Sequence, residues 1–143
     1  KFSKKKGRVY VMVSDGECQE GTTWETLLIA AKHKLDNLIL IIDYNKIQAL
    51  SKLKDALPLN NLKKKILSFN WNCEEVKDGH SFKDLYNCFS KIKKNNKPTA
   101  IILNTIKGKG IKEFENDPVW HARQLKGREI DIGRRRLGIK RED

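Results

Sequence analysis

The sequence predicts an α/β fold: an open, mostly parallel sheet with helices on both faces. Two short apolar runs, VYVMV (9–13) and LILII (38–42), have the continuous apolar character of strands that are buried on both sides of a parallel sheet. Between such runs, apolar residues recur every three or four positions, as they do in amphipathic helices. This β–α–β–α alternation, with right-handed crossovers, is typical of open sheets covered by helices.

Each predicted strand is rich in β-branched or aliphatic residues and ends in a turn signal. The first is expected to be a buried strand, because valines fill it between Gly7 and Asp15-Gly16. The third is followed by the turn residues Asp78-Gly79. The four strands are predicted at 8–14, 38–43, 72–77 and 99–105.

The predicted helices lie between these strands. The first carries an apolar stripe of Trp24, Leu27, Leu28 and Ala31, and Thr22 or Thr23 can cap it. Ser81 is the expected cap of a later helix, whose stripe consists of Phe82, Leu85, Phe89 and Ile92. The predicted ranges are 20–34, 59–68, 81–94 and, interrupted by Gly133, 128–137, with residues 46–57 expected as loop.

Length and composition fit one ordinary domain. The chain has 143 residues, 38% of them hydrophobic, and no apolar run approaches the roughly 20 residues needed to span a bilayer. Neither an apolar h-region nor a cleavage site follows the basic N-terminal residues, so no signal peptide is predicted. Cys18, Cys73 and Cys88 form no CxxC pair, so neither a zinc site nor a disulfide framework is indicated. A cytoplasmic protein is the prediction.

The net charge of +12 raises the expectation of anionic partners, which include nucleic acid, a membrane surface and phosphorylated metabolites. The basic residues are spread along the chain, and no nucleic-acid-binding motif accompanies them. Solvated lysine-rich faces are therefore favoured over RNA binding.

Polar residues follow three of the predicted strands at one edge of the sheet. They are Asp15-Gly16, Asp43-Tyr44-Asn45 and Lys107-Gly108-Lys109-Gly110. Ligands of open α/β sheets bind at this carboxyl edge. Asp15 and Asn45, with the carbonyl of a residue just past Asn45 such as Ile47, supply the oxygen ligands that Mg²⁺ prefers, and Gly16 lets the backbone approach a diphosphate. Considered alone, each pair is also compatible with an ordinary turn.

The Lys107–Gly110 segment has two open interpretations. Its glycines can expose backbone N–H groups to a phosphate, and its lysines add charge. It is equally compatible with a flexible turn that carries solvated lysines. His33 is expected to be structural or exposed, and His80, which follows a turn, is expected to bond the backbone locally. Nothing near Cys18 marks it as a nucleophile.

The segments SDGECQEGTTWE (14–25) and KLDNLILIIDYNKIQ (34–48) together resemble the thiamine-diphosphate motif of the transketolase family. That motif reads Gly-Asp-Gly-x-x-x-Glu-Gly and is followed by Asp-x-Asn-x-Ile. Asp15 and Asn45 are 30 residues apart, which matches the family's spacing, and DGH (78–80), KPT (97–99) and TIKGKG (105–110) add to the likeness. Ser14 stands where glycine is usual.

The resemblance implies thiamine diphosphate and Mg²⁺ (or Ca²⁺) as cofactors. It implies that Asp15, Asn45 and the Ile47 carbonyl ligate the metal, and that Gly16 and the adjoining Glu17 belong to the cofactor site. It also implies that His121 contacts the diphosphate and the substrate, although the glycine usual after it is Ala122 here. Glu20 and Glu25 match acidic positions at the family's subunit interface.

The likeness is greatest to the N-terminal subunit of split transketolases. It implies that residues 1–125 are the C-terminal portion of a diphosphate-binding domain, with the fold incomplete at its N-terminus, and that 126–143 form a charged tail. The implied partner is a pyrimidine-binding domain or subunit, in a homodimer or heterotetramer that transfers a two-carbon ketol unit between sugar phosphates. The alternatives are an inactive fragment and a basic α/β module that binds RNA.

Overall fold

The computed structural model describes residues 6–49 and 51–140. Its sheet has four strands in the order β1-β2-β4-β3, and every neighbouring pair is parallel. The strands are β1 (Val9–Ser14), β2 (Leu38–Tyr44), β3 (Asn72–Val76) and β4 (Thr99–Asn104). The predicted fold class and the position of each strand are confirmed.

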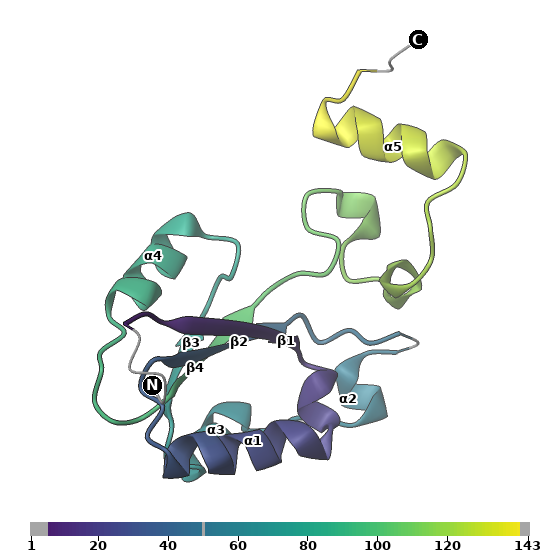
Figure 1. Cartoon of the computed structure of the whole chain (residues 1–143). Helices are drawn as coiled ribbons and strands as arrows, with labels where there is room; N and C mark the ends of the chain where they lie inside the picture. Colours follow the sequence, from purple (N-terminus) through teal and green to yellow (C-terminus); the bar gives the residue numbers. More distant parts are fainter. Residues whose placement is uncertain (1–5, 50, 141–143) are drawn as a thin grey trace.

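Helices cover both faces of the sheet. On one face lie α1 (Gly21–Lys32) and α3 (Leu62–Ser68), and on the other lies α4 (Phe82–Ser90) (Figure 1). The chain moves in one direction across the sheet through α1 and α3 and then reverses from β3 to β4. Right-handed crossovers in opposite directions place their helices on opposite faces.

Two hydrophobic clusters fill the layers between helices and sheet. The larger lies on the α1 and α3 side and includes Leu27, Ile42, Ile66, Trp71 and Ile102. The smaller lies on the α4 side and includes Ile39, Val76, Ile101 and Leu103. β2 and β4 contribute to both clusters, since they are the two inner strands.

The first strand differs from its prediction. β1 was expected to be buried, but Val9, Tyr10, Val11 and Met12 are all exposed, Met12 to 64%. The sequence pattern of β1 is that of an inner strand, yet β1 pairs only with β2 and forms an edge of the described sheet. Burial depends on neighbours that local sequence does not specify.

Several helix details also differ. α1 begins after Glu20 without a side-chain cap, because Thr23 Oγ1 donates instead to the Glu17 carbonyl. Leu28 and Phe82, predicted to lie on apolar stripes, are 60% and 89% exposed. A short helix, α2 (Leu53–Ala56), lies inside the predicted loop. The predicted Ser81 cap is confirmed, since its hydroxyl accepts from the Asp84 N–H.

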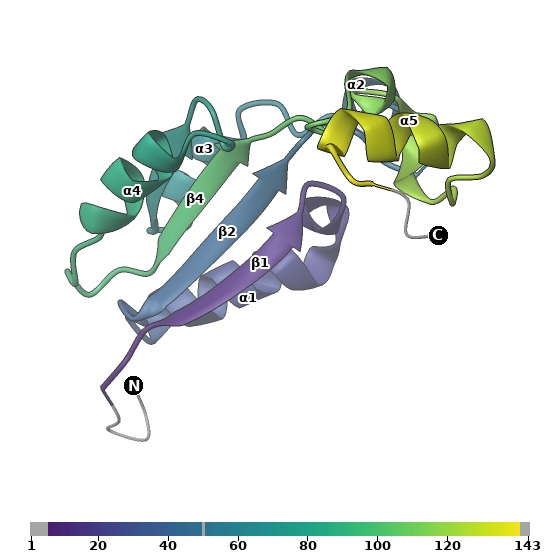
Figure 2. The ribbon, with the colours of Figure 1, turned by 90° about the horizontal axis from the view of Figure 1, so that it is seen from above.

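The C-terminal part lies beyond the carboxyl ends of the strands (Figure 2). It consists of the turns Lys112–Phe114 and Pro118–His121 and of α5 (Arg128–Leu137). Gly133 was predicted to interrupt this helix, but α5 continues through it. Gly133 is buried there, with the side chains of Ile111 and Leu125 nearby. The predicted division of the chain into residues 1–125 and a charged tail of residues 126–143 stays a prediction. Residues 1–5 and 141–143 of these two ranges lie outside the part that the structure describes. No helix in the described ranges is long and apolar enough to cross a membrane.

Candidate functional site at the carboxyl edge of the sheet

The structure brings Asp15 and Asn45 together at the carboxyl ends of β1 and β2. The Asp15 N–H donates to the Asp43 carbonyl at 3.1 Å, which continues the strand pairing past Ser14. The Lys46 N–H, one residue after Asn45, donates to Asp15 Oδ2 at 2.6 Å. Two residues that are 30 positions apart in sequence are thereby joined by a backbone contact at one point of the edge.

Asp15 is an ionisable side chain that is almost fully buried, with 1% of its surface exposed. Burial raises the pKa of this carboxyl above its usual value. The nearby Asp43 carboxylate adds to the increase, while backbone hydrogen bonds from Lys46 and Gly16 and the charge of His121 oppose it. Neither of its hydrogen-bond partners is a cationic side chain, so a bound cation would strongly favour its ionised form.

Asn45 is held by hydrogen bonds on both ends of its amide. Its Nδ2 donates to Asp43 Oδ2 at 3.1 Å, and its Oδ1 accepts from the Ile47 N–H at 2.9 Å. The second lone pair of Oδ1 remains for another partner. Ile47 itself is buried, and its backbone forms an isolated bridge with Lys52.

Asp43 connects this site to the next strand, a role that the sequence did not reveal. Its Oδ1 accepts a short hydrogen bond from Thr105 Oγ1, directly after β4. The Asp43 carboxylate therefore accepts from the Asn45 amide through Oδ2 and from Thr105 through Oδ1. In this way Thr105 positions Asp43, and Asp43 positions Asn45. The only sequence signal for Thr105 was its place at the start of the TIKGKG segment.

Glu17 and Ser14 form a reciprocal pair around the Asp15-Gly16 turn. The Ser14 N–H and hydroxyl donate to Glu17 Oε2 at 2.7 and 3.0 Å, and the Glu17 N–H donates back to Ser14 Oγ at 3.3 Å. Ser14, where the family pattern has glycine, thus supports the turn. Gly16 has an ordinary helical φ of −62°, and a Cβ there would meet nothing closer than 3.6 Å. The described protein does not itself require glycine at that position.

The Lys107–Gly110 loop packs against the segment that follows it. Gly108 has a φ of +76°, and a Cβ there would lie 2.4 Å from the Phe114 carbonyl oxygen. The Gly110 N–H donates to Glu115 Oε1, which Lys109 Nζ approaches to 3.8 Å. The Glu115 carboxylate therefore already accepts from one of the backbone N–H groups that could bind a phosphate.

His80 anchors the start of that loop. Its Nε2 accepts from the Ile106 N–H at 2.8 Å, and its backbone N–H donates to Asp78 Oδ1 at 2.9 Å. The expected local backbone bonding of His80 is confirmed, with the addition of a long-range bond. Gly79 allows this close approach, because a Cβ there would lie 2.7 Å from Thr105 Cγ2. Its N–H donates to the Asn104 carbonyl at 2.8 Å.

His121 ends the turn Pro118–His121 and is exposed. It lies close enough to Asp15 to lower the pKa of that carboxyl. The preceding Trp120 packs against Phe114 with ring centroids 4.3 Å apart and ring planes tilted by 40°. The Arg123 guanidinium lies 4.4 Å from the centroid of the Trp120 ring. Ala122 has a φ of −128°, a conformation that needs no glycine.

The remaining candidates fall outside this group. Glu20 and Glu25 lie on the exposed start of α1, apart from the buried Asp15. Burial raises the pKa of the Cys18 thiol to about 12, which fits the expectation that it is no nucleophile. In residues 6–49 and 51–140, no three His, Cys, Asp or Glu side chains form a metal-binding group.

The donor set at this edge fits a hard divalent cation. It combines a buried carboxylate, an amide oxygen and a backbone carbonyl, all of them oxygen ligands that Mg²⁺ and Ca²⁺ accept. Fold and site together define an α/β domain with a polar binding site at the carboxyl edge of a parallel sheet.

Comparison with known proteins gives this class a family. Residues 2–143 match the model for the transketolase thiamine diphosphate binding domain, and the chain belongs to that family. It is 40% identical over 132 residues to one of the subunits of the apulose-4-phosphate transketolase of Actinobacillus succinogenes, covering 92% of this chain and 48% of that protein. It is 39% identical over 128 residues to rat transketolase, covering 87% of this chain and 19% of that protein.

Solved structures agree with this assignment. The transketolase of Campylobacter jejuni superposes with a TM-score of 0.84 at 29% identity, over 93% of this chain and 21% of that one. The chain spans about half the length of the Actinobacillus protein and a smaller part of the rat and Campylobacter transketolases. The predicted family, its thiamine-diphosphate-binding domain and the resemblance to split-transketolase subunits are confirmed.

Proposed function

We propose that this chain anchors Mg²⁺ and the diphosphate of thiamine diphosphate in a transketolase-like enzyme, which moves a two-carbon ketol unit between sugar phosphates. The observation that carries the proposal is the junction of buried Asp15 with the Asn45–Ile47 turn through the Lys46 N–H. The bound cofactor supplies the covalent chemistry of ketol transfer, and the protein's residues bind and orient it.

Each residue has a defined part in this anchoring. The Asp15 carboxylate, Asn45 Oδ1 and the Ile47 carbonyl are the metal's protein ligands. Gly16 leaves room for the diphosphate beside the turn that Ser14 and Glu17 hold. His121 donates a hydrogen bond to the diphosphate or to the substrate, from its exposed place near Asp15.

The complete enzyme needs a partner that carries the pyrimidine-binding domain, in a homodimer or heterotetramer. The proteins similar to this chain include ones named as transketolase subunits, which supports a split enzyme. Glu20 and Glu25 are exposed at the start of α1, as residues of a subunit interface must be in a separated chain. We expect the chain alone to show no ketose turnover. Turnover by the purified chain would contradict this.

Calorimetry of the complex between this chain and its pyrimidine-binding partner tests the proposal. Thiamine diphosphate is titrated with and without Mg²⁺ into the wild type, Asp15→Asn and Asn45→Ala. We expect the Mg²⁺-dependent affinity to fall on the order of 100-fold in both variants. Asp55→Asn, at an exposed position of α2, is the matched control and should bind normally. Unchanged affinity in both site variants would remove the metal assignment.

A further inference from the structure

Two adjoining hollows lie beside α3 and α2 and share Tyr44 as a wall. They have volumes of about 480 and about 250 Å³. Five lysines line them: Lys46, Lys52, Lys54, Lys63 and Lys64. We call the two together the lysine hollow. Neither Asp15, Asn45 nor His121 lines it, so the hollow adjoins the anchoring site without including its candidate ligands.

The described residues offset only part of the positive charge of the lysine hollow. None of the five lysines forms an ion pair there. Glu75 is the one acidic side chain in the described lining, and its carboxylate also accepts from Asn104 Nδ2 at 3.0 Å. Several like charges around a concave surface produce a field that attracts anions.

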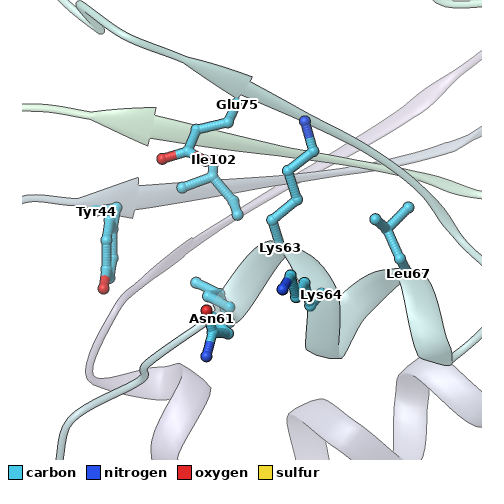
Figure 3. Close-up of a pocket in the computed structure, with 8 residues that line it drawn as sticks. Tyr44, Asn61, Lys63, Lys64, Leu67, Glu75 and Ile102 are labelled. Carbon is cyan, nitrogen blue, oxygen red and sulfur yellow. The ribbon is translucent and has the colours of Figure 1, made fainter.

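The view into the larger hollow shows how its polar groups are arranged. Lys63 extends from α3 toward the sheet, and the Tyr44 ring projects from the end of β2 toward the loop that carries Asn61 (Figure 3). Within the described ranges, the Tyr44 hydroxyl has no hydrogen-bond partner, and Lys46 Nζ lies 5.1 Å from the centroid of the ring. The Tyr44 hydroxyl is therefore available to donate a hydrogen bond to a ligand.

Apolar side chains form the remaining walls. Leu53, Leu59, Leu62 and Ile102 line the hollows and are buried. A volume of 480 Å³ with an apolar lining and a few polar groups is typical of small-molecule sites. Inorganic phosphate alone would leave this apolar surface uncovered.

We propose that the lysine hollow binds a small organic phosphate. The phosphate contacts Lys63, Lys64 and the Tyr44 hydroxyl, and the organic part covers the Tyr44 ring and the leucines. The lysines bind the anion directly, so no metal is required. This site goes beyond the proposed function and does not depend on it.

Calorimetry on the full chain with phenyl phosphate as probe tests the proposal, in EDTA and at low ionic strength. We expect one binding site, with an affinity at least about tenfold weaker in Lys63→Gln/Lys64→Gln. Lys83→Gln/Lys91→Gln, on the opposite face in and just after α4, removes the same charge and should change affinity less than about twofold. Lys52→Gln/Lys54→Gln provides a second pair of lysines from the smaller hollow and should also weaken binding.

Three results would overturn the proposal. They are no binding to the wild type, an equal loss in the two α3 and α4 double variants, and binding of inorganic phosphate as tight as that of phenyl phosphate. A single-stranded RNA oligonucleotide that binds more tightly than phenyl phosphate and depends on the same lysines would assign the surface to nucleic acid instead. Asp15→Asn should retain phenyl phosphate binding. Failure of the metal-anchoring proposal can thereby be distinguished from failure of the proposal for the lysine hollow.

Discussion

The anchoring site and the lysine hollow meet at Tyr44 but have opposite charge. In the anchoring site, the carboxylate of Asp43 lies close enough to Asp15 to raise the pKa of the Asp15 carboxyl. The lysine hollow holds five cationic side chains without an ion pair among the described residues. An anionic ligand can enter the first only with a cation between it and the protein, whereas it can bind the second directly. Metal dependence is therefore the property that distinguishes the two sites.

Removal of the metal should have the largest effect. In the assembled complex, we expect chelation of Mg²⁺ to weaken thiamine diphosphate binding on the order of 100-fold or more. The same chelation should leave phenyl phosphate binding at the lysine hollow unchanged. Calorimetry with both ligands in one buffer makes the comparison, and equal sensitivity to EDTA would contradict the distinction.

Gly79→Ala should destabilise the fold that carries both sites. A Cβ there would lie 2.7 Å from Thr105 Cγ2 and 3.1 Å from the Asn104 carbonyl oxygen. We expect a loss of about 1–3 kcal/mol in the free energy of unfolding, measured in urea. Gly133→Ala is the control, because its Cβ would meet only ordinary contacts at 3.6 Å in a helix, where alanine is favoured. A loss in the control as large as in Gly79→Ala would contradict the steric explanation.

Thr105→Val tests whether Asp43 and Thr105 position Asn45. The substitution keeps the shape of the side chain but removes the donor to Asp43 Oδ1. We expect the Mg²⁺ affinity of the loaded complex to fall by about tenfold, with phenyl phosphate binding unaffected. Thr22→Val, on the exposed start of α1, should leave Mg²⁺ affinity unchanged. Normal affinity in Thr105→Val would show that Asn45 needs no support from β4.

The smallest effect concerns stability without metal. Because the pKa of Asp15 is raised in the fold, its protonated form is favoured there, and this contribution is lost as pH rises through that pKa. At neutral pH in EDTA, Asp15→Asn should therefore be more stable than the wild type. The difference should vanish as pH falls below the pKa of Asp15, and Mg²⁺ with cofactor should reverse it. Thermal unfolding across pH measures this, and a less stable variant at neutral pH would contradict it.

The sequence predicted the elements and the two strand ends well, since both depend on local pattern. Residues 38–43 and 99–105 form continuous apolar runs, and inner strands require such runs. Burial of Val9–Met12 was predicted wrongly, because an edge position depends on which strands lie beside β1. The Asp43–Thr105 contact was missed for a similar reason. It exists because β4 pairs with β2, an order that neither segment specifies by itself.

The lysine hollow was also beyond the reach of the sequence. Its lysines appeared as part of a basic composition that favoured solvated faces, and residues 46–57 were expected to be loop. The five lysines lie around Tyr44 because α2 and α3 pack beside the end of β2. This packing brings together lysines whose charge is spread along the sequence.

Anomalous diffraction from crystals of the assembled complex, grown with Mn²⁺ in place of Mg²⁺ and with thiamine diphosphate, tests the central claim most directly. The metal should appear roughly 2.1 Å from Asp15, from Asn45 Oδ1 and from the Ile47 carbonyl oxygen. A fully occupied metal that touches none of these three groups would contradict the anchoring function assigned to this chain.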